Sequence, residues 1–238
     1  MNYIMEYSIV IPLFNEAESL GVLQERIEQV MRPLSCQYEI IYVNDGSNDN
    51  SLERLEELKK KYNNIESISL KSNRGQSAAL YVGFKKAQGE WIITMDADCQ
   101  NPPEEISKLI KEKDGVDFIT GIRKKRKDTL LRRISSQTAK AFRYIVLKDT
   151  TQDAGCSLKM FKREIVSEIP FFKNFHRFFT FLVRLKGFLV REVYVAHNGR
   201  EFGKSKYTTF RRAREGFFDL GGVYWLKRRI LKYEIERG

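Results

Sequence analysis

Two aspartates stand one residue apart in the segment ITMDADCQNPPEE, residues 93–105. Asp96 and Asp98 lie on the same side of an extended chain, where two like charges are costly unless a cation lies between them. Mg²⁺ and Mn²⁺ prefer oxygen ligands, and Mg²⁺ typically takes one or two carboxylates together with water and substrate phosphates. We therefore predict that Asp96, Asp98 and Gln100 hold Mg²⁺ or Mn²⁺ beside a diphosphate. The alternative is a pair of surface acids that cap the helix expected at Pro102.

The acid pair ends one of five short apolar runs, which we interpret as β-strands. Several runs are almost continuously apolar, which is typical of buried parallel strands. Between them, apolar residues recur at helical spacing. This alternation predicts an α/β fold with a mostly parallel sheet and helices on both faces. The expected strands are residues 7–14, 39–45, 65–71, 90–96 and 116–122.

Polar residues follow the first four expected strands. The first strand leads to Asn15 and Glu16, the second to NDGSND (residues 44–49), the third to KSNRGQS (residues 71–77) and the fourth to the acid pair. In open α/β sheets, ligands bind beyond the carboxyl ends of the strands. Any one of these loops could be only a helix cap or a glycine turn. Several such loops at one edge of a sheet predict a ligand site.

Eight motifs occur in the order SIVIPLFNE, VNDGSNDNS, NRGQSAAL, DADCQNPPE, GIR, DAGCSLKMFKRE, HRFF and HNGREFGKSKY. In order and spacing they resemble the GT-A glycosyltransferases of family 2, and more narrowly the dolichyl- and polyprenyl-phosphate glycosyltransferases of the dolichol-phosphate mannose synthase type. The resemblance covers roughly residues 8–219. It implies a GT-A (Rossmann-like) fold and metal-dependent, inverting transfer of a sugar from a GDP- or UDP-sugar to a polyprenyl phosphate, undecaprenyl or dolichyl.

We predict catalytic roles for Asp98, Arg123 and Asp153. Asp153 is expected to orient, or to act as a base when the acceptor is a hydroxyl, with a structural cap as the alternative. A loop containing Arg200 and Lys206 is expected to close over the donor diphosphate, with a charged turn as the alternative. The residues expected to bind the nucleotide sugar are Pro12, Asn15, Glu16, Asp45, Ser47, Asn73, Gly75, Asp96, Arg200 and Lys206.

A basic segment, residues 123–148, holds ten Lys or Arg and one acid. A lipid phosphate is mostly dianionic at neutral pH, so as a nucleophile it hardly needs a general base. It does need cations that bring two anions together, and Arg binds phosphate oxygens in a bidentate manner. We predict that Arg123, Arg132, Arg133 and Ser135 bind the acceptor phosphate. For each arginine the alternative is a solvated basic helix face.

Other function classes fit the sequence less well. A family 2 enzyme that glycosylates a glycan hydroxyl in cell-envelope polysaccharide synthesis is the main alternative, with Asp153 as its base. A nucleotidyltransferase usually has a Gly-rich signature with a lysine near its first strand, and IPLFNE lacks one. The net charge of +11 and the pI near 9.5 favour an anionic partner. No RNA- or DNA-binding motif is recognisable, so we expect no nucleic-acid partner.

We predict a catalytic domain, residues 1–207, followed by amphipathic interfacial helices, residues 208–238. The tail interleaves aromatic with basic residues, which favours an anionic membrane surface. Packing against the body or a partner subunit is the alternative. Neither a secretory signal nor an apolar stretch of about 18 residues is visible, and the three cysteines suggest neither a disulfide framework nor a zinc site. The expected location is therefore cytoplasmic, peripheral on the cytoplasmic face of the membrane, with the oligomeric state open.

Overall fold

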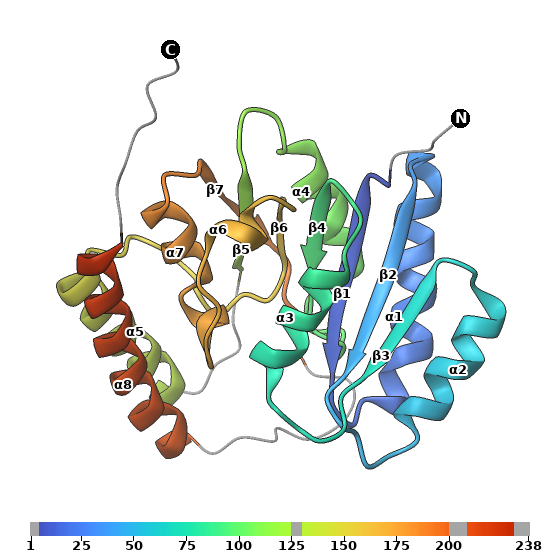
Figure 1. Cartoon of the computed structure of the whole chain (residues 1–238), viewed down its shortest axis with the longest axis horizontal. Helices are drawn as coiled ribbons and strands as arrows, with labels where there is room; N and C mark the ends of the chain where they lie inside the picture. The colour runs from blue at the N-terminus through green and yellow to red at the C-terminus, as the bar shows by residue number, and fades with distance from the viewer. Residues whose placement is uncertain (1–4, 125–129, 200–208, 231–238) are drawn as a thin grey trace. The chain divides into compact units, whose positions relative to one another are not determined.

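A computed structural model of the chain describes residues 5–124, 130–199 and 209–230, with side chains for 5–124, 137–199 and 215–230 (Figure 1). The chain forms two compact units. The first comprises residues 1–127 and 152–204, and the second comprises residues 128–151 and 205–238.

The first unit is built on a seven-stranded sheet of order β3-β2-β1-β4-β6-β5-β7. Strand β6 pairs antiparallel with β4 and β5, and all the other pairs are parallel. Five strands match the expected apolar runs, so the predicted α/β fold with a mostly parallel sheet is confirmed. The strands are β1 (Tyr7–Leu13), β2 (Tyr38–Asn44), β3 (Ile65–Ser69), β4 (Trp91–Thr94), β5 (Phe118–Arg123), β6 (Lys159–Lys162) and β7 (Val190–Val195).

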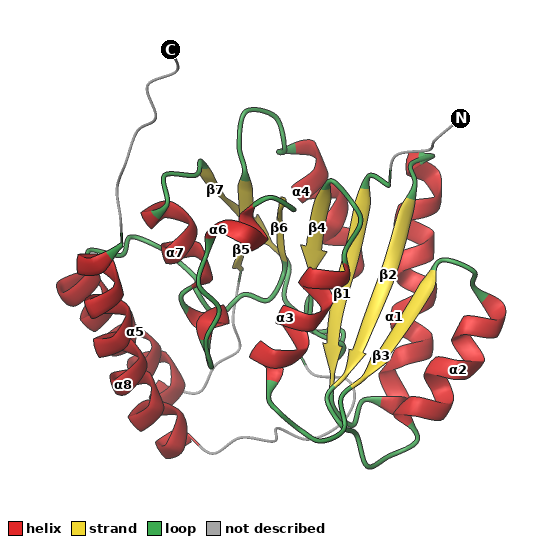
Figure 2. Cartoon of the chain, in the orientation of Figure 1, coloured by secondary structure: helices red, strands yellow, loops and turns green. Residues whose placement is uncertain are grey.

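Helices cover both faces of this sheet (Figure 2). The helical spacing of apolar residues in the sequence correctly predicts α1, α2 and α4. The helices of the first unit are α1 (Ala17–Met31), α2 (Ser51–Lys61), α3 (Gln76–Lys86), α4 (Ile106–Lys111), α6 (Ile165–Glu168) and α7 (Phe179–Leu185). Short 3₁₀ turns lie at Arg32–Leu34, Pro103–Glu105 and Phe175–Arg177.

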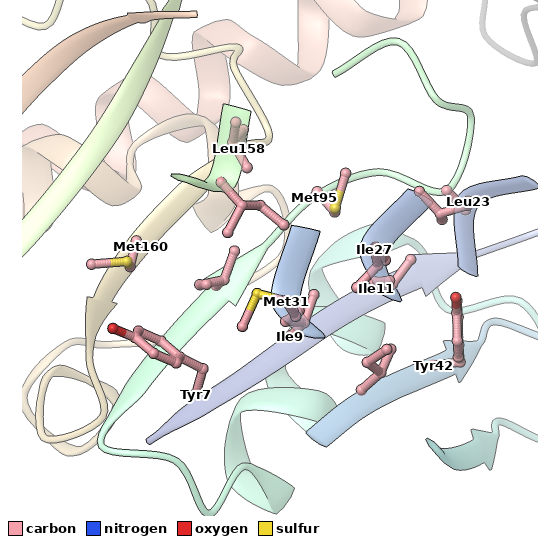
Figure 3. Close-up of a cluster of buried hydrophobic side chains, with 14 of the residues drawn as sticks. Tyr7, Ile9, Ile11, Leu23, Ile27, Met31, Tyr42, Met95, Leu158 and Met160 are labelled. Atoms are coloured by element: carbon pink, nitrogen blue, oxygen red, sulfur yellow. The ribbon is translucent and has the colours of Figure 1, made fainter. Parts of the chain in front are cut away.

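Strand β1 is buried on both sides because helices pack against both of its faces. Ile9 and Ile11 join Leu23 and Ile27 of α1 in one apolar cluster (Figure 3). On the opposite face α3 approaches closely, and a Cβ on its Gly83 would collide with Cγ1 of Val10. Burial of each large aliphatic side chain contributes roughly 1.5–3 kcal/mol. This packing fixes the strand ends from which the polar loops leave.

The described part of the second unit contains two helices that pack side by side, α5 (Leu130–Leu147) and α8 (Thr209–Arg229) (Figure 1). The rings of Phe142 and Phe217 meet edge to face with centroids 5.4 Å apart. Nζ of Lys227 donates to the carbonyl oxygen of Leu147 at 2.6 Å, which satisfies a C-terminal carbonyl of α5. Among the described residues, no helix has both the length and the apolarity needed to cross a bilayer.

Candidate active site

The acid pair lies just beyond β4, in the first unit. Asp98 is 6% exposed, and Asp96 is half-buried. The turn that follows passes through Cys99 at φ +57°, and the backbone N–H of Gln100 donates to Oδ1 of Asp98 at 3.2 Å. Burial, together with the charge of Asp98, raises the pKa of Asp96 to about 6. Two partly desolvated carboxylates that stand one residue apart favour a bound cation.

Gln76, the first residue of α3, orients one of these acids. Its Nε2 donates to Oδ1 of Asp96 at 2.7 Å, and the side chain of Ser157 also hydrogen-bonds Asp96. Oγ of Ser157 in turn accepts from Nδ2 of Asn101 at 2.7 Å. Gln76 is not among the site residues predicted from the sequence. Its position within the NRGQS motif is the signal that could have identified it.

Asp45 anchors the turn formed by Asn73, Arg74 and Gly75, which we call the NRG turn. Its two carboxylate oxygens accept the backbone N–H groups of Arg74 and Gly75 at 2.7 and 2.8 Å, and the residue is 3% exposed. Gly75 has φ +88°, a conformation that favours glycine. A Cβ on Gly46 would lie 2.7 Å from the backbone N of Asn73, so the loops after β2 and β3 also touch. Asp45 therefore shapes the loop that we expect to meet the donor.

The loops after β1 and β2 are tied together as well. Asn15, at φ +54°, donates its backbone N–H to Oγ of Ser47 at 2.9 Å, and its Oδ1 accepts the backbone N–H of Asn48 at 2.8 Å. The backbone N–H of Glu16 donates to Oγ of Ser51 at 3.0 Å. The residues expected around the nucleoside thus lie at neighbouring strand ends, with Pro12 buried inside β1. Their binding role stays a prediction.

Arg123 and Asp153 form a buried bidentate ion pair. Nε and Nη2 of Arg123 each donate to a carboxylate oxygen of Asp153 at 2.7 Å, and the two side chains are 14% and 9% exposed. A Cβ on Gly155 would lie 2.8 Å from Nη2 of Arg123, so a side chain at this position would require the guanidinium to shift. Because both oxygens of Asp153 accept from Arg123, this geometry favours an orienting role for Asp153 over a base role.

Two further contacts bring distant segments to this edge. The backbone N–H of Asn198, after β7, donates to the carbonyl oxygen of Gln100 at 2.8 Å. Oγ of Ser77, on α3, lies 2.9 Å from Nδ1 of His176. Arg200 and Lys206 fall outside the described residues. Arg132, Arg133 and Ser135 lie in helix α5, but their side chains are outside the described part of the structure.

The donor set fits a hard dication. In the described part of the chain, no three His, Cys, Asp or Glu side chains gather into a complete metal site. Asp96 and Asp98 offer carboxylate oxygens and Gln100 offers an amide oxygen. Such an incomplete oxygen site suits Mg²⁺ or Mn²⁺, which fill the remaining positions with water and phosphate oxygens.

Comparison with known proteins decides the family. The family model "Glycosyl transferase family 2" matches residues 8–170. The chain belongs to glycosyl transferase family 2. This result confirms the resemblance seen in the sequence motifs.

Two bacterial members of the family are similar to this chain over most of its length. Both are undecaprenyl-phosphate 4-deoxy-4-formamido-L-arabinose transferases. The protein from Photorhabdus laumondii subsp. laumondii is 40% identical over 210 residues, 86% of this chain and 64% of the relative. The protein from Pectobacterium atrosepticum is also 40% identical over 210 residues, 86% of this chain and 63% of the relative. The chain thus spans less than two thirds of the length of these curated relatives.

Solved structures support the fold. Glucosyl-3-phosphoglycerate synthase from Mycobacterium tuberculosis, crystallised with Mn²⁺, UDP and its product, superposes with a TM-score of 0.70 at 12% identity, covering 96% of this chain and 81% of that chain. TarS of S. aureus superposes with a TM-score of 0.64 at 15% identity, covering 97% and 67% of the two chains. At such low identities the likeness concerns the fold alone, and it agrees with the predicted GT-A architecture of this family 2 chain.

Proposed function

We propose that this family 2 glycosyltransferase transfers a sugar from a nucleotide-sugar donor to undecaprenyl phosphate. The observation that carries the proposal is the 40% identity, over 86% of this chain, to proteins named as undecaprenyl-phosphate sugar transferases. The site chemistry agrees, because an acid pair suited to a metal diphosphate and a buried arginine lie at the same sheet edge. A uridine nucleotide is the favoured donor, since the M. tuberculosis neighbour was crystallised with UDP.

On the donor side, Asp96, Asp98 and Gln100 would hold Mg²⁺ or Mn²⁺. The cation would stabilise the negative charge that develops on the departing diphosphate. Gln76 orients the carboxylate of Asp96 by its 2.7 Å hydrogen bond. Asp45 keeps the NRG turn in place through the backbone N–H groups of Arg74 and Gly75. These hydrogen bonds therefore fix the shape of the site before the donor binds.

In the proposed reaction, an oxygen of the lipid phosphate attacks the anomeric carbon and forms a new carbon–oxygen bond. The bond from that carbon to the β-phosphate oxygen breaks, and its electron pair leaves with the nucleoside diphosphate. The anomeric configuration inverts, and no proton is transferred when the acceptor is a dianion. Arg123 pairs with Asp153 through Nε and Nη2, so Nη1 is the part of the guanidinium expected to face a phosphate.

An acceptor assay tests this function. The purified chain would be incubated with radiolabelled UDP-sugars, MnCl₂ and either undecaprenyl phosphate or oligosaccharides. We expect label to enter the organic phase with equimolar release of UDP, and EDTA to abolish transfer. Label that moves only to oligosaccharides would reject the lipid acceptor and support the glycan-hydroxyl alternative.

We also propose that the second unit binds an anionic membrane surface peripherally. Phe218 and Trp225 are seven residues apart on α8, hence on one face, and are 77% and 63% exposed. Ile145 of α5 is 65% exposed. Among the described side chains, Lys140 of α5 and Arg228 and Arg229 of α8 are exposed, as is Lys148 directly after α5. Apolar side chains that enter the interface, next to cations that meet lipid phosphates, describe such a surface.

Vesicle sedimentation tests the membrane proposal. We expect the chain to sediment with phosphatidylglycerol vesicles at low salt, to sediment less at high salt, and to stay in solution with phosphatidylcholine vesicles. The double variant Phe218→Ser/Trp225→Ser should lose most of this binding, whereas Tyr81→Ser, on an exposed position of the first unit, should retain it. Equal sedimentation of both variants would reject α8 as the contact.

A further inference from the structure

A buried lysine lies at the same sheet edge as the acid pair. Lys159 is the first residue of β6 and is 3% exposed. Because β6 runs antiparallel to β4 and β5, its first residue lies at their carboxyl ends, opposite Thr94 and Thr120. The reaction described above assigns no role to Lys159.

The ammonium group has few hydrogen-bond partners for a buried cation. Nζ of Lys159 donates to Oγ1 of Thr120 at 3.2 Å and to the carbonyl oxygen of Cys156. Both partners are neutral, and burial lowers the pKa of this lysine. A buried charge is costly without compensation by charges of opposite sign nearby. The compensation therefore has to come from carboxylates that Lys159 does not touch directly.

Those carboxylates belong to the candidate site. The charge of Lys159 interacts with Asp153 and with Asp96. Asp153 is already paired with Arg123 in a bidentate manner. Within the described residues, Asp96 interacts with the charges of Asp98, Arg123 and Lys159. Because Arg123 is already paired with Asp153, the charge of Lys159 is left to offset that of Asp96.

We propose that Lys159 acts through its charge as a built-in counterion of the Asp96/Asp98 pair, weakening the binding of a divalent metal and strengthening the binding of the donor diphosphate. The inference rests on the proposed metal-dependent function and adds a residue to it. A positive charge repels a dication and attracts a diphosphate at the same edge. Metal alone is then held weakly, and the two ligands together are held well, because the diphosphate supplies the negative charge that the dication needs.

The test measures each ligand alone. Mn²⁺ binding without nucleotide would be followed by electron paramagnetic resonance of free Mn²⁺, and UDP binding without metal by calorimetry. In Lys159→Met we expect the Kd for Mn²⁺ to fall and the Kd for UDP to rise, each by at least about threefold. A purely structural lysine would weaken both ligands or neither, and either result would overturn the proposal.

Lys162 supplies a matched control. It lies at the other end of the same strand and pairs with Asp117 at 2.8 Å. Lys162→Met removes the same charge far along the strand, so both Kd values should stay within about twofold of wild type, since Coulomb energy falls with distance. An equal response of the two variants would mean that net charge alone is responsible, and would also overturn the proposal.

Two more variants keep the result interpretable. Lys159→Gln removes the charge but keeps a donor, and it should behave like Lys159→Met. Lys159→Arg keeps the charge and should stay near wild type. Unfolding of both neutral variants, with Lys159→Arg folded, would assign the charge to folding and contradict the proposal. If the wild-type chain binds neither Mn²⁺ nor UDP, the proposed function fails; if wild type binds both and Lys159→Met is unchanged, only this inference fails.

Discussion

At the amino ends of the strands, a groove of about 440 Å³ is lined by two lysines that each pair with a carboxylate. Lys113 contacts Glu6 at 3.0 Å, and Lys162 contacts Asp117 at 2.8 Å. There, despite burial, hydrogen bonds from Lys113 and Lys162 lower the pKa values of Glu6 and Asp117. At the carboxyl ends, burial and the charge of Asp98 instead raise the pKa of Asp96 to about 6. The direction of these pKa shifts, and not the size of a hollow, therefore distinguishes the edge suited to a cation.

The largest effect should come from removing one member of the acid pair. Asp98→Asn takes away a metal ligand, and loss of several kcal/mol of transition-state stabilisation lowers the rate of sugar transfer by about 1,000-fold. Transfer of labelled sugar to undecaprenyl phosphate measures it. Asp117→Asn, at the opposite edge, should change the rate less than about threefold, since surface ion pairs contribute little. Comparable losses in the two variants would remove the distinction between the edges.

Substitution of Arg123 should impair the reaction with the acceptor and leave binding of the donor nearly unchanged. Arg123→Lys keeps the charge but cannot form the two parallel hydrogen bonds, so kcat/KM for the lipid phosphate should fall by about 30-fold. The KM for the nucleotide sugar should change little. Steady-state kinetics with each substrate varied in turn provide the measurement. A loss confined to the donor would assign Arg123 to the other half of the reaction.

Substitution of Gln76 should change the affinity for the metal more than the stability of the fold. Gln76→Ala leaves Asp96 without one of its hydrogen bonds, and loss of such a supporting contact weakens metal binding by about tenfold. Mn²⁺ titration gives the Kd. Gln24→Ala removes a similar amide-to-carboxylate bond, from Gln24 to Glu28 at 2.9 Å, within α1. This control should lower Tm without changing the Kd, and a reversed pattern would contradict the orienting role.

The smallest effect concerns pH. The pKa of Asp96 is about 6 in the folded chain against an ordinary value of 3.8, so the folded state binds more protons between these limits. The contribution of Asp96 to the free energy of unfolding of the metal-free chain therefore decreases as pH rises from about 4 to 6, and it stays low above pH 6. Binding of Mn²⁺ should weaken as pH falls below 6, because protons then compete for Asp96. Denaturant unfolding at several pH values measures the first effect, and Asp96→Asn should flatten it.

The sequence predicted those features that depend on neighbouring residues. Strands β1 to β5 are apolar runs, and Asp96 and Asp98 are adjacent in one loop, so both could be recognised locally. The bond between Gln76 and Asp96 spans 20 residues, and the pair Arg123–Asp153 spans 30. Such pairs are created by the sheet order, and for Arg123–Asp153 this order inserts β6 between β4 and β5. Nothing in the linear pattern revealed that insertion.

Strand β6 itself was missed for a related reason. It has only four residues, and its first is Lys159, a charged residue that seldom begins a buried strand. The pairing of α5 with α8 likewise joins segments far apart in the chain. The predicted division of the chain at residue 207 stays a prediction.

The two hydrogen bonds that the backbone N–H groups of Arg74 and Gly75 donate to Asp45 matter for inhibitor design. Because the turn is already fixed by two short bonds, a ligand that follows its contour loses little entropy to loop ordering on association. Rigid diphosphate mimics should therefore outperform flexible ones of equal charge. Replacing this aspartate would instead impose an ordering cost on every compound that contacts the turn.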